Sequence, residues 1–468
     1  MRIAIIGAGI TGVCTAFELA DDGHDVTVFD RRGSVAAEAS FATAGLLGHA
    51  SLLPWAERRV GLPGWLGALA GQGPLHWHRR ADRGSLRWLW QWSRSAGLPV
   101  NADRWQQLQQ LARFSQERLH DLRTRLKLDI ERAQGALVVF QTERARDAAQ
   151  ADLARLAQWA VPHTWLDADA CRARETGLSA DAPLAGGVWL PGDEVSNCRQ
   201  VAHALRHHAQ RAGVTFRFHS AVSALRAGGT GQRPQVVHVY APPEDSTVLS
   251  PSAASPGSHG AHDAPRTEAQ PFSPTEEAFD AVVVCAAQGA ASLLGPLGLA
   301  LPLAAVSGVT LTAPMRLDEA HPGRGPSSAL LDAQARVLVT RMGHRLRVSG
   351  GALLGAGNAT QQGQALETLE QALRTWYPGV ARLSQALRWQ GVRTATPDGM
   401  PLIGASGAPG VWLNLGHGDT GWALACGSAR LLADRLRLRG ASRSAHDLSL
   451  ATGSDTNANT AIASGLNG

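Results

Sequence analysis

The sequence predicts an α/β protein: a Rossmann-like domain at its start and a second α+β domain built on a mixed β-sheet. An apolar, strand-like run at residues 2–6 leads into a G-x-G-x-x-G sequence at residues 7–12. Residues 11–21 then have helical periodicity, and residues 25–30 form a second strand-like run that ends on an acid. The chain has 468 residues, 44% of them hydrophobic, which is enough for two domains.

The first glycine-rich loop has the complete context of a dinucleotide site. Gly7 permits the tight turn, Gly9 lets the backbone approach a pyrophosphate, and Gly12 lets the helix pack closely on the strand. The phosphate charge would then lie at the positive end of the helix. The alternative is an ordinary glycine-rich turn without a ligand.

The acid that ends the second strand indicates how the nucleotide is held. Asp30 is placed to accept hydrogen bonds from an adenosine ribose. The motif alone leaves FAD and NAD open. Arg31 and Arg32 follow directly and would suit the 2′-phosphate of NADP, so that cofactor is also an alternative at this point.

A second G-x-G-x-x-G occurs at Gly416, Gly418 and Gly421, between an apolar run at 411–415 and a helix-like segment at 421–437. A second nucleotide site would need a strand and a terminal acid after this helix, whereas the chain continues into a polar tail. We therefore predict one dinucleotide. The second loop is interpreted as a bare helix N-terminus that faces the N1–C2=O edge of a flavin, which gains negative charge on reduction.

Composition excludes several classes of function. Lys127 is the only lysine, so neither a phosphate loop nor Schiff-base chemistry is expected. The net charge of +5 is modest and the arginines are spaced among acids, so we expect no nucleic acid partner. The five cysteines and the histidine pairs lack the spacing of ligand clusters, so we expect no metal. Scattered cysteines, and the lack of a signal peptide or a long apolar run, favour a cytoplasmic protein.

Three segments stand out by composition. Residues 51–94 contain six tryptophans interleaved with arginines. They are either core or oligomer contacts, or a peripheral contact with the inner face of the cytoplasmic membrane. Residues 242–277 are rich in Pro, Ser, Ala and Gly and are predicted to be a disordered surface insertion. Residues 441–468 are predicted to be a flexible tail, and no oligomeric state is predicted.

Several longer motifs together resemble one known family. They are IIGAGITGV, SFATAGLL followed by LPWA, SLRWLWQW, GVWLPGDEVSNC, GVRTATPDGMPLIG and LNLGHGDTGWALACGSARLLAD. They extend from Met1 to about Leu450, apart from the insertion. The chain is similar to bacterial FAD-dependent D-amino acid dehydrogenases, within the larger D-amino acid oxidase and glycine oxidase superfamily.

The resemblance implies both an architecture and an activity. The FAD domain would be assembled from residues 1–50, 190–305 and 390–440, and the substrate domain from residues 51–189 and 306–389. The activity would be oxidation of a D-amino acid to an imino acid, which hydrolyses to a 2-oxo acid and ammonia. Electrons would pass to a quinone or other acceptor.

The resemblance also implies site residues. Arg393 would bind the substrate carboxylate, for which a planar guanidinium is suited, unless it pairs with Asp398 in the same loop. His417 would hydrogen-bond flavin or substrate, or else be a packed histidine. The first glycine loop and Asp30 would hold the ADP half, Thr43–Gly45 would lie along the flavin ring, and Val222 would contact adenine. The predicted FAD contacts are Gly7, Ala8, Gly9, Ile10, Thr11, Gly12, Asp30, Arg31, Thr43, Ala44, Gly45, Val222, Ala286, Gly416, Gly418, Asp419, Thr420 and Gly421.

The chain departs from the family pattern near the expected substrate pocket. Ser307 and Val309 replace a family lysine and tyrosine, and residues 49–51 replace a Pro-Gly-Tyr. Thr43 stands where asparagine is common. These departures predict a less polar pocket, and they leave two alternatives: an oxygen-using oxidase of glycine or N-methyl amino acids, and a flavin-binding subunit without catalysis.

Overall fold

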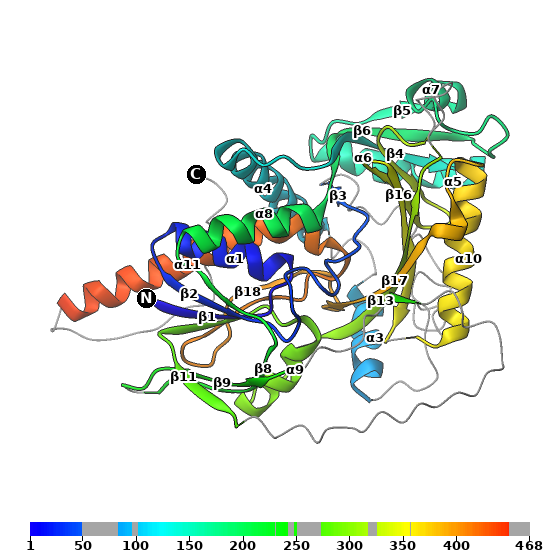
Figure 1. Ribbon diagram of the computed structural model, residues 1–468. Helices are drawn as coiled ribbons and strands as arrows, with labels where there is room; N and C mark the ends of the chain where they lie inside the picture. Colours follow the sequence, from blue (N-terminus) through cyan, green and yellow to red (C-terminus); the bar gives the residue numbers. More distant parts are fainter. Residues whose placement is uncertain are drawn as a thin grey trace, which may run out of the picture.

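Two large β-sheets, each covered by helices, organise the chain (Figure 1). The computed structural model describes residues 1–48, 83–95, 102–229, 231–241, 248–249, 273–316, 325–355 and 357–448. One sheet is largely parallel and begins with the N-terminal strand, and the other is mixed. The prediction of an α/β fold with a Rossmann-like domain and a mixed second sheet is confirmed.

The six-stranded sheet has β1 (Arg2–Ile6) near its centre. Its order is β18 (Leu402–Ala405), β19 (Val411–Leu415), β12 (Ala281–Val284), β1, β2 (Asp25–Phe29) and β7 (Thr215–Arg217). All neighbours are parallel except β18 and β19. Because both faces of β1 are buried from Ile3 to Ile6, the sequence there is continuously apolar rather than alternating.

Four helices pack on one face of this sheet and a small sheet packs on the other (Figure 1). The helices are α1 (Ile10–Asp21), α4 (Ala102–Leu126), α8 (Cys198–Arg211) and α11 (Gly421–Leu448). The small sheet comprises β8 (Ser220–Arg226), β9 (Gln235–Tyr240) and β11 (Thr275–Ala278). Side chains of β1 alternate between the two cores, with Ile3 and Ile5 under the helices and Ala4 and Ile6 over the small sheet.

The ten-stranded sheet is mostly antiparallel, with one parallel pair, β14 and β4. Its order is β10 (Val248–Leu249), β17 (Leu387–Ala395), β13 (Ala304–Pro314), β16 (Arg345–Leu354), β15 (Val337–Met342), β14 (Ala329–Asp332), β4 (Arg132–Phe140), β6 (Gly186–Ser196) and β3 (Leu46–Leu47), and β5 (Thr164–Leu166) also pairs with β6. The remaining helices are α3 (Arg83–Ser95), α5 (Glu143–Ala148), α6 (Gln150–Gln158), α7 (Ala168–Arg174), α9 (Ala290–Leu294) and α10 (Ala359–Trp376).

The two faces of β13 and β17 differ in character. One face is apolar and packs under α10, with Val309 and Leu311 buried against Leu373. The opposite face carries Val306, Gly308 and Thr310 on β13, and Trp389, Gly391 and Arg393 on β17, paired as Val306 with Arg393, Gly308 with Gly391 and Thr310 with Trp389. We call this opposite face the site face. Polar groups on a half-buried sheet face are typical of a ligand site rather than of a core.

Three segments differ from the predicted organisation or lie partly outside the described residues. Of the predicted insertion 242–277, residues 248–249 pair with β17 and residues 275–277 belong to β11, so these parts are ordered strands. Helix α11 continues to Leu448, beyond the predicted end. Of residues 51–94, the described part forms α3. Residues 273–274 are exposed coil, and residues 49–82, 242–247, 250–272 and 449–468 lie outside the described residues.

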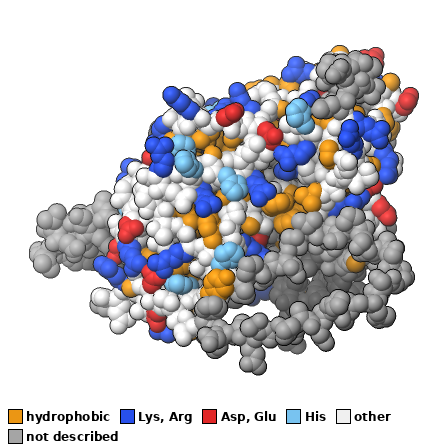
Figure 2. Space-filling model, in the orientation of Figure 1, with side chains coloured by type: hydrophobic (Ala, Val, Ile, Leu, Met, Phe, Trp, Pro, Cys, Tyr) orange, Lys and Arg blue, Asp and Glu red, His pale blue; other side chains and the backbone are white. Residues whose placement is uncertain are grey.

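The charged surface is mixed. On the face in Figure 2, arginine side chains are spread over the surface among acidic and apolar ones, as their spacing in the sequence predicts. Among the helices of the described ranges, every one is too short or too polar to cross a membrane.

The buried carboxylate of Glu18 joins α1, α4 and α11. Arg118 of α4 donates from Nε and Nη2 to its two oxygens at 2.8 Å each, and Arg430 of α11 donates to Oε2 at 2.9 Å. Arg430 also pairs with Asp22 at 2.5 Å and with Asp434 at 2.9 Å. Burial alone would raise the pKa of Asp22, but the hydrogen bond and charge of Arg430 hold that pKa below its usual value. The three helices are therefore fixed by an ion-pair network, not by apolar packing alone.

We predict that Glu18→Gln lowers the free energy of unfolding by about 3 kcal/mol, because the variant leaves two half-buried guanidiniums without their shared carboxylate. Urea denaturation followed by circular dichroism measures this. The control is Glu117→Gln, which breaks the exposed pair of Arg113 with Glu117 on α4 and should cost no more than about 0.5 kcal/mol. Equal losses in the two variants would contradict the role given to Glu18.

Candidate active site

The first glycine loop is a close contact between backbones. Gly7 has φ +104°, and a Cβ there would lie 2.8 Å from the carbonyl oxygen of Cys285. A Cβ on Gly12 would lie 1.9 Å from the carbonyl oxygen of Gly7. Neither position therefore accepts a side chain, and α1 begins directly against the carboxyl ends of β1 and β12.

The start of α1 fits a diphosphate. Gly9 is the N-cap and has no side chain with which to cap the helix, and the first turn carries no acid. Ser40 Oγ is the nearest atom to a Cβ built on Gly9, at 3.6 Å, and it accepts the N–H of Ile10 at 3.1 Å. The positive helix end is thus left for an anion, as the cofactor prediction requires. Ser40 was not predicted from the sequence, because it comes from a loop after β2.

Asp30 at the end of β2 is tied to the glycine loop. Its Oδ2 accepts the N–H of Ala8 at 2.6 Å and its Oδ1 accepts the N–H of Arg32 at 2.7 Å. Burial raises the pKa of Asp30, although these two hydrogen bonds act in the opposite direction. Because each carboxylate oxygen can accept more than one hydrogen bond, capacity for a ribose hydroxyl remains. The ribose contact stays a prediction.

The arginines that suggested NADP share one acid. Arg31 Nη2 lies 2.6 Å and Arg32 Nε lies 2.8 Å from Oε1 of Glu38. Burial alone would raise the pKa of Glu38, but the two guanidiniums hold it low, so Glu38 is a carboxylate. A 2′-phosphate would have to share these cations with that negative charge. The arrangement favours a nucleotide without the extra phosphate.

Two further predicted FAD contacts lie beside the first loop. The Cα of Ala286 is 3.2 Å from a Cβ built on Gly7. Val222 is in β8, whose first residue, Ser220, donates its N–H to the carbonyl of Asp30 at 2.9 Å. Both residues are therefore brought to the nucleotide end of the site, and their contacts with FAD stay predictions.

The predicted flavin loop, Thr43–Gly45, joins the two large sheets. The carbonyl of Ala44 accepts the hydroxyl of Thr340 on β15 at 2.8 Å. The carbonyl of Gly45 accepts the indole N–H of Trp422 on α11 at 3.2 Å and the N–H of Ser196 at 2.8 Å. The carbonyls of Ala44 and Gly45 thus accept hydrogen bonds from the protein, and these bonds hold the loop in place.

Arg347 on β16 holds the same loop and was not predicted. Its buried guanidinium donates from Nη1 to the carbonyl of Thr43 at 3.0 Å and from Nε to Thr312 Oγ1 at 3.2 Å. Burial, with the nearby charge of Arg345, lowers the pKa of Arg347 to about 10. The available signal was an arginine at an inward position of an alternating strand, RLRVSGG.

The second glycine loop packs against the end of β17. Gly416 has φ +81°, and a Cβ there would lie 3.0 Å from Thr396. Gly418 has φ +54°, and a Cβ there would lie 3.3 Å from Ala395. A short 3-10 turn, Gly418–Thr420, leads into α11 at Gly421. No strand follows α11 within the described residues. The loop is thus a helix N-terminus without a second nucleotide-binding unit.

His417 in this loop is a packed histidine. Its ring is buried, and Nε2 lies 3.2 Å from the hydroxyl of Ser428 in α11. Burial lowers the pKa of His417 to about 4, so the ring is neutral near pH 7. It therefore supplies no positive charge, and its predicted contact with flavin or substrate stays a prediction.

Arg393 lies on the site face and pairs with the second glycine loop. A Cβ on Gly308 would lie 2.8 Å from Arg393 Nη2, so the guanidinium rests against the backbone of β13. Nε of Arg393 is 2.6 Å from Oδ1 of Asp419. Asp398, the partner considered from the sequence, pairs instead with Arg104 at 3.5 Å, so that alternative is wrong.

The two substitutions at Ser307 and Val309 do not face Arg393. Side chains alternate along a strand, and Gly308 between them is the residue that contacts Arg393. Val309 is buried under α10, and the hydroxyl of Ser307 donates to the carbonyl of Leu353 at 3.4 Å. Their expected effect on pocket polarity therefore cannot come from direct contact beside Arg393.

A buried donor lies on the site face at Trp389. In the described part of the chain, its indole N–H has no acceptor. The ring packs against Phe41, with 4.4 Å between centroids, at the start of the segment that leads to the flavin loop. A buried donor without a partner is costly, so this N–H is available to an acceptor on a ligand. The sequence offered no signal for it.

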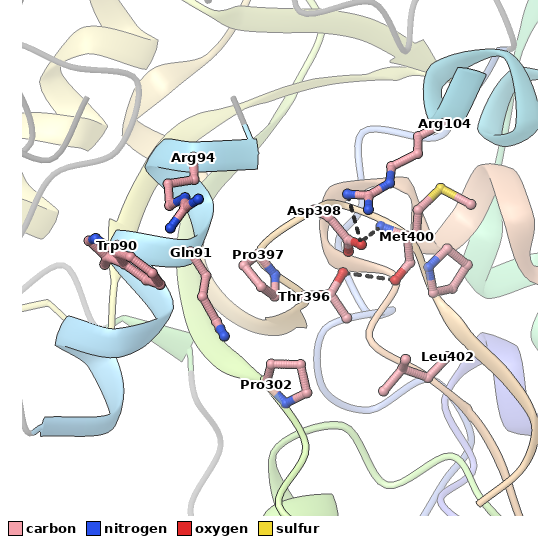
Figure 3. A pocket seen from close by; sticks show the side chains of 11 residues that line it. Trp90, Gln91, Arg94, Arg104, Pro302, Thr396, Pro397, Asp398, Met400 and Leu402 are labelled. Atoms are coloured by element: carbon pink, nitrogen blue, oxygen red, sulfur yellow. Dashed lines mark hydrogen bonds and ion pairs between the residues drawn. The ribbon is translucent and has the colours of Figure 1, made fainter. Parts of the chain in front are cut away.

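A pocket of about 380 Å³ opens between α3 and the loop after β17 (Figure 3). Trp90, Gln91 and Arg94 line it from the α3 side, and Arg104 and Asp398 form an ion pair across from them. Asp398 is therefore paired with Arg104 and not with Arg393, whose ion-pair partner is Asp419.

Acidification should weaken the fold through His417. The folded-state pKa of about 4 lies below the usual value of 6.5, so the unfolded chain binds the extra proton first. The stabilisation is complete above pH 6.5 and is lost as the pH falls towards 4, by roughly 3 kcal/mol. Urea denaturation measures the free energy of unfolding at pH 7 and at pH 4.5. This free energy should fall less between the two pH values in His417→Gln than in the parent protein. The same substitution at the exposed His344 should leave the drop unchanged.

Comparison with known proteins identifies the family of this chain. Residues 2–435 match the family described as FAD dependent oxidoreductase. A D-amino acid dehydrogenase of Cereibacter sphaeroides is 35% identical over 437 residues, covering 93% of this chain and 91% of that protein. A D-amino acid dehydrogenase of Rhizorhabdus wittichii is also 35% identical, and the match covers 93% of this chain and 95% of that protein.

Solved structures show the same fold. Glycine oxidase from Bacillus cereus superposes with a TM-score of 0.64 at 18% identity, covering 94% of this chain and 95% of that one. The FAD-bound L-α-glycerophosphate oxidase from Mycoplasma pneumoniae gives a TM-score of 0.59 at 15% identity, covering 93% and 94%. The family match over residues 2–435 confirms FAD as the cofactor, and the chain belongs to the family of FAD dependent oxidoreductases.

Proposed function

We propose that this enzyme deaminates a D-amino acid oxidatively, giving a 2-oxo acid and ammonia, and that it passes the electrons to a quinone-type acceptor. The observation that carries the proposal is Arg393 on the site face, beside Gly308 and the second glycine loop. The relatives named D-amino acid dehydrogenase, at 35% identity, support the substrate class. Residues 1–50, 190–305 and 390–440 would hold FAD, although strand β17 crosses the boundary at 390.

In this proposal the protein acts mainly by positioning. Arg393 would bind the substrate carboxylate with charge-assisted hydrogen bonds and so orient the Cα–H bond. Bound FAD would supply the two-electron acceptor for that hydride. The first glycine loop would hold its diphosphate, and the N-terminus of α11 would favour negative charge on the ring. No side-chain base is required, because the substrate needs only a neutral amine.

The acceptor proposal rests on α3. Trp90 and Leu86 are 54% and 51% exposed, and the guanidinium of Arg94 lies 4.7 Å above the Trp90 ring. Exposed apolar side chains beside arginines are suited to an anionic membrane surface, where quinones are found. This supports a peripheral contact of α3 with the membrane. The catalytically inactive alternative loses its support, because Ser307 and Val309 face away from Arg393.

Replacing Arg393 should separate substrate binding from cofactor binding. Arg393→Leu should raise the KM for D-amino acids by roughly 100-fold, since a charge-assisted carboxylate contact is lost, while FAD stays bound. The control is Arg388→Leu on the same strand, which pairs with Glu370 of α10 on the opposite face. An unchanged KM in Arg393→Leu would refute the assigned role.

Anaerobic reduction tests the reaction itself. At least one of a panel of D-amino acids should bleach the flavin absorbance, and a soluble quinone should restore it much faster than oxygen does. Stoichiometric peroxide release in air would instead indicate an oxidase. Reduction by dithionite but by no amino acid would reject the dehydrogenase proposal.

A further inference from the structure

We infer that the Asp419 carboxylate binds the substrate's ammonium group, so that Arg393 and Asp419 together select a zwitterion over a simple carboxylate. The inference rests on the proposed function and deepens it. Asp419 belongs to the second glycine loop, for which the sequence predicted only a contact with FAD.

The Arg393 guanidinium and the Asp419 carboxylate are in direct contact. Asp419 Oδ1 is 2.6 Å from Arg393 Nε. Asp419 lies in the turn that leads into α11, whereas Arg393 lies on β17 of the ten-stranded sheet. Nη2 of the same guanidinium rests against the backbone at Gly308. A ligand carboxylate that binds Arg393 must therefore come close to the Asp419 carboxylate.

Both partners remain reachable by a ligand. The side chain of Asp419 is 64% exposed and that of Arg393 is 31% exposed, in contrast to the buried Glu18 network. The turn is itself fixed, because the hydroxyl of Thr420 donates to the carbonyl of His417 at 2.7 Å and Gly418 has a positive φ. Asp419 is thus a carboxylate on a rigid turn with an accessible oxygen.

Charge complementarity then favours an α-amino acid. A carboxylate without a cation meets repulsion from Asp419 and competes with it for Arg393. In a zwitterion the ammonium lies one carbon from the carboxylate, so it offers Asp419 a new partner in place of Arg393. One ion pair within the protein is exchanged for two with the ligand. The ammonium then loses a proton to solvent before hydride leaves Cα, so Asp419 is a positioning residue and not a base.

The experiment compares two ligands that differ only in the amine. We would measure the KM for D-alanine, and the Kd for propionate from the change in the flavin spectrum, in the holoenzyme and its Asp419→Asn variant. The KM for D-alanine should rise on the order of tenfold and the Kd for propionate should fall on the order of tenfold. These opposite changes distinguish recognition of the amine from general damage to the site, which would weaken both ligands.

The control is Asp147→Asn. Asp147 is also an exposed aspartate in an ion pair, at 3.0 Å with Arg146, but it lies on α5 and outside the Glu18 network. It should change neither constant. The inference is wrong if the parent enzyme oxidises D-amino acids but Asp419→Asn changes neither the KM for D-alanine nor the Kd for propionate. It is also wrong if the variant raises both constants. In either case the proposed function stands. Should no D-amino acid of the panel bind or reduce the flavin in the parent enzyme, both fall together.

Discussion

The ion pairs at Glu18 join the two helices that begin at the glycine loops of the proposed cofactor site. Glu18 and Arg430 are 412 residues apart in the chain, yet they link α1 and α11 directly. Each helix begins at a glycine loop, and in the proposed site FAD would extend from one loop to the other. The packing of α1 against α11 would then determine the separation of the two loops.

The site is assembled where the two large sheets meet. The Rossmann-like sheet supplies helix N-termini, which suit negative charge, and the mixed sheet supplies a polar face with Arg393, Arg347 and Trp389. In the proposed site, one unit would stabilise charge on the cofactor and the other would bind the substrate carboxylate. This division explains why the residues that matter come from stretches far apart in the sequence.

Local motifs could be read from the sequence and long-range partners could not. Gly12 was predictable because its close contact, the carbonyl of Gly7, lies within one β-α unit, whereas the contact of Gly7 with Cys285 could not be read from the local motif. The partner of Arg393 was not, because Asp419 reaches it only after two sheets pack, and a nearer acid in the sequence was the wrong alternative. Ser307 and Val309 were expected to affect the pocket, but strand alternation turns them to the α10 face.

The backbone carbonyl of Gly45 restricts movement of the Thr43–Gly45 loop. The oxygen of Gly45 is shared by an indole N–H and a strand N–H, so moving the Thr43–Gly45 loop would break contacts with α11 and with β6 at once. Gly45 also has φ +81°, and a Cβ there would meet Met342 at 2.3 Å. In the proposed site this loop would be a fixed boundary, so substrate and product would enter and leave on another side.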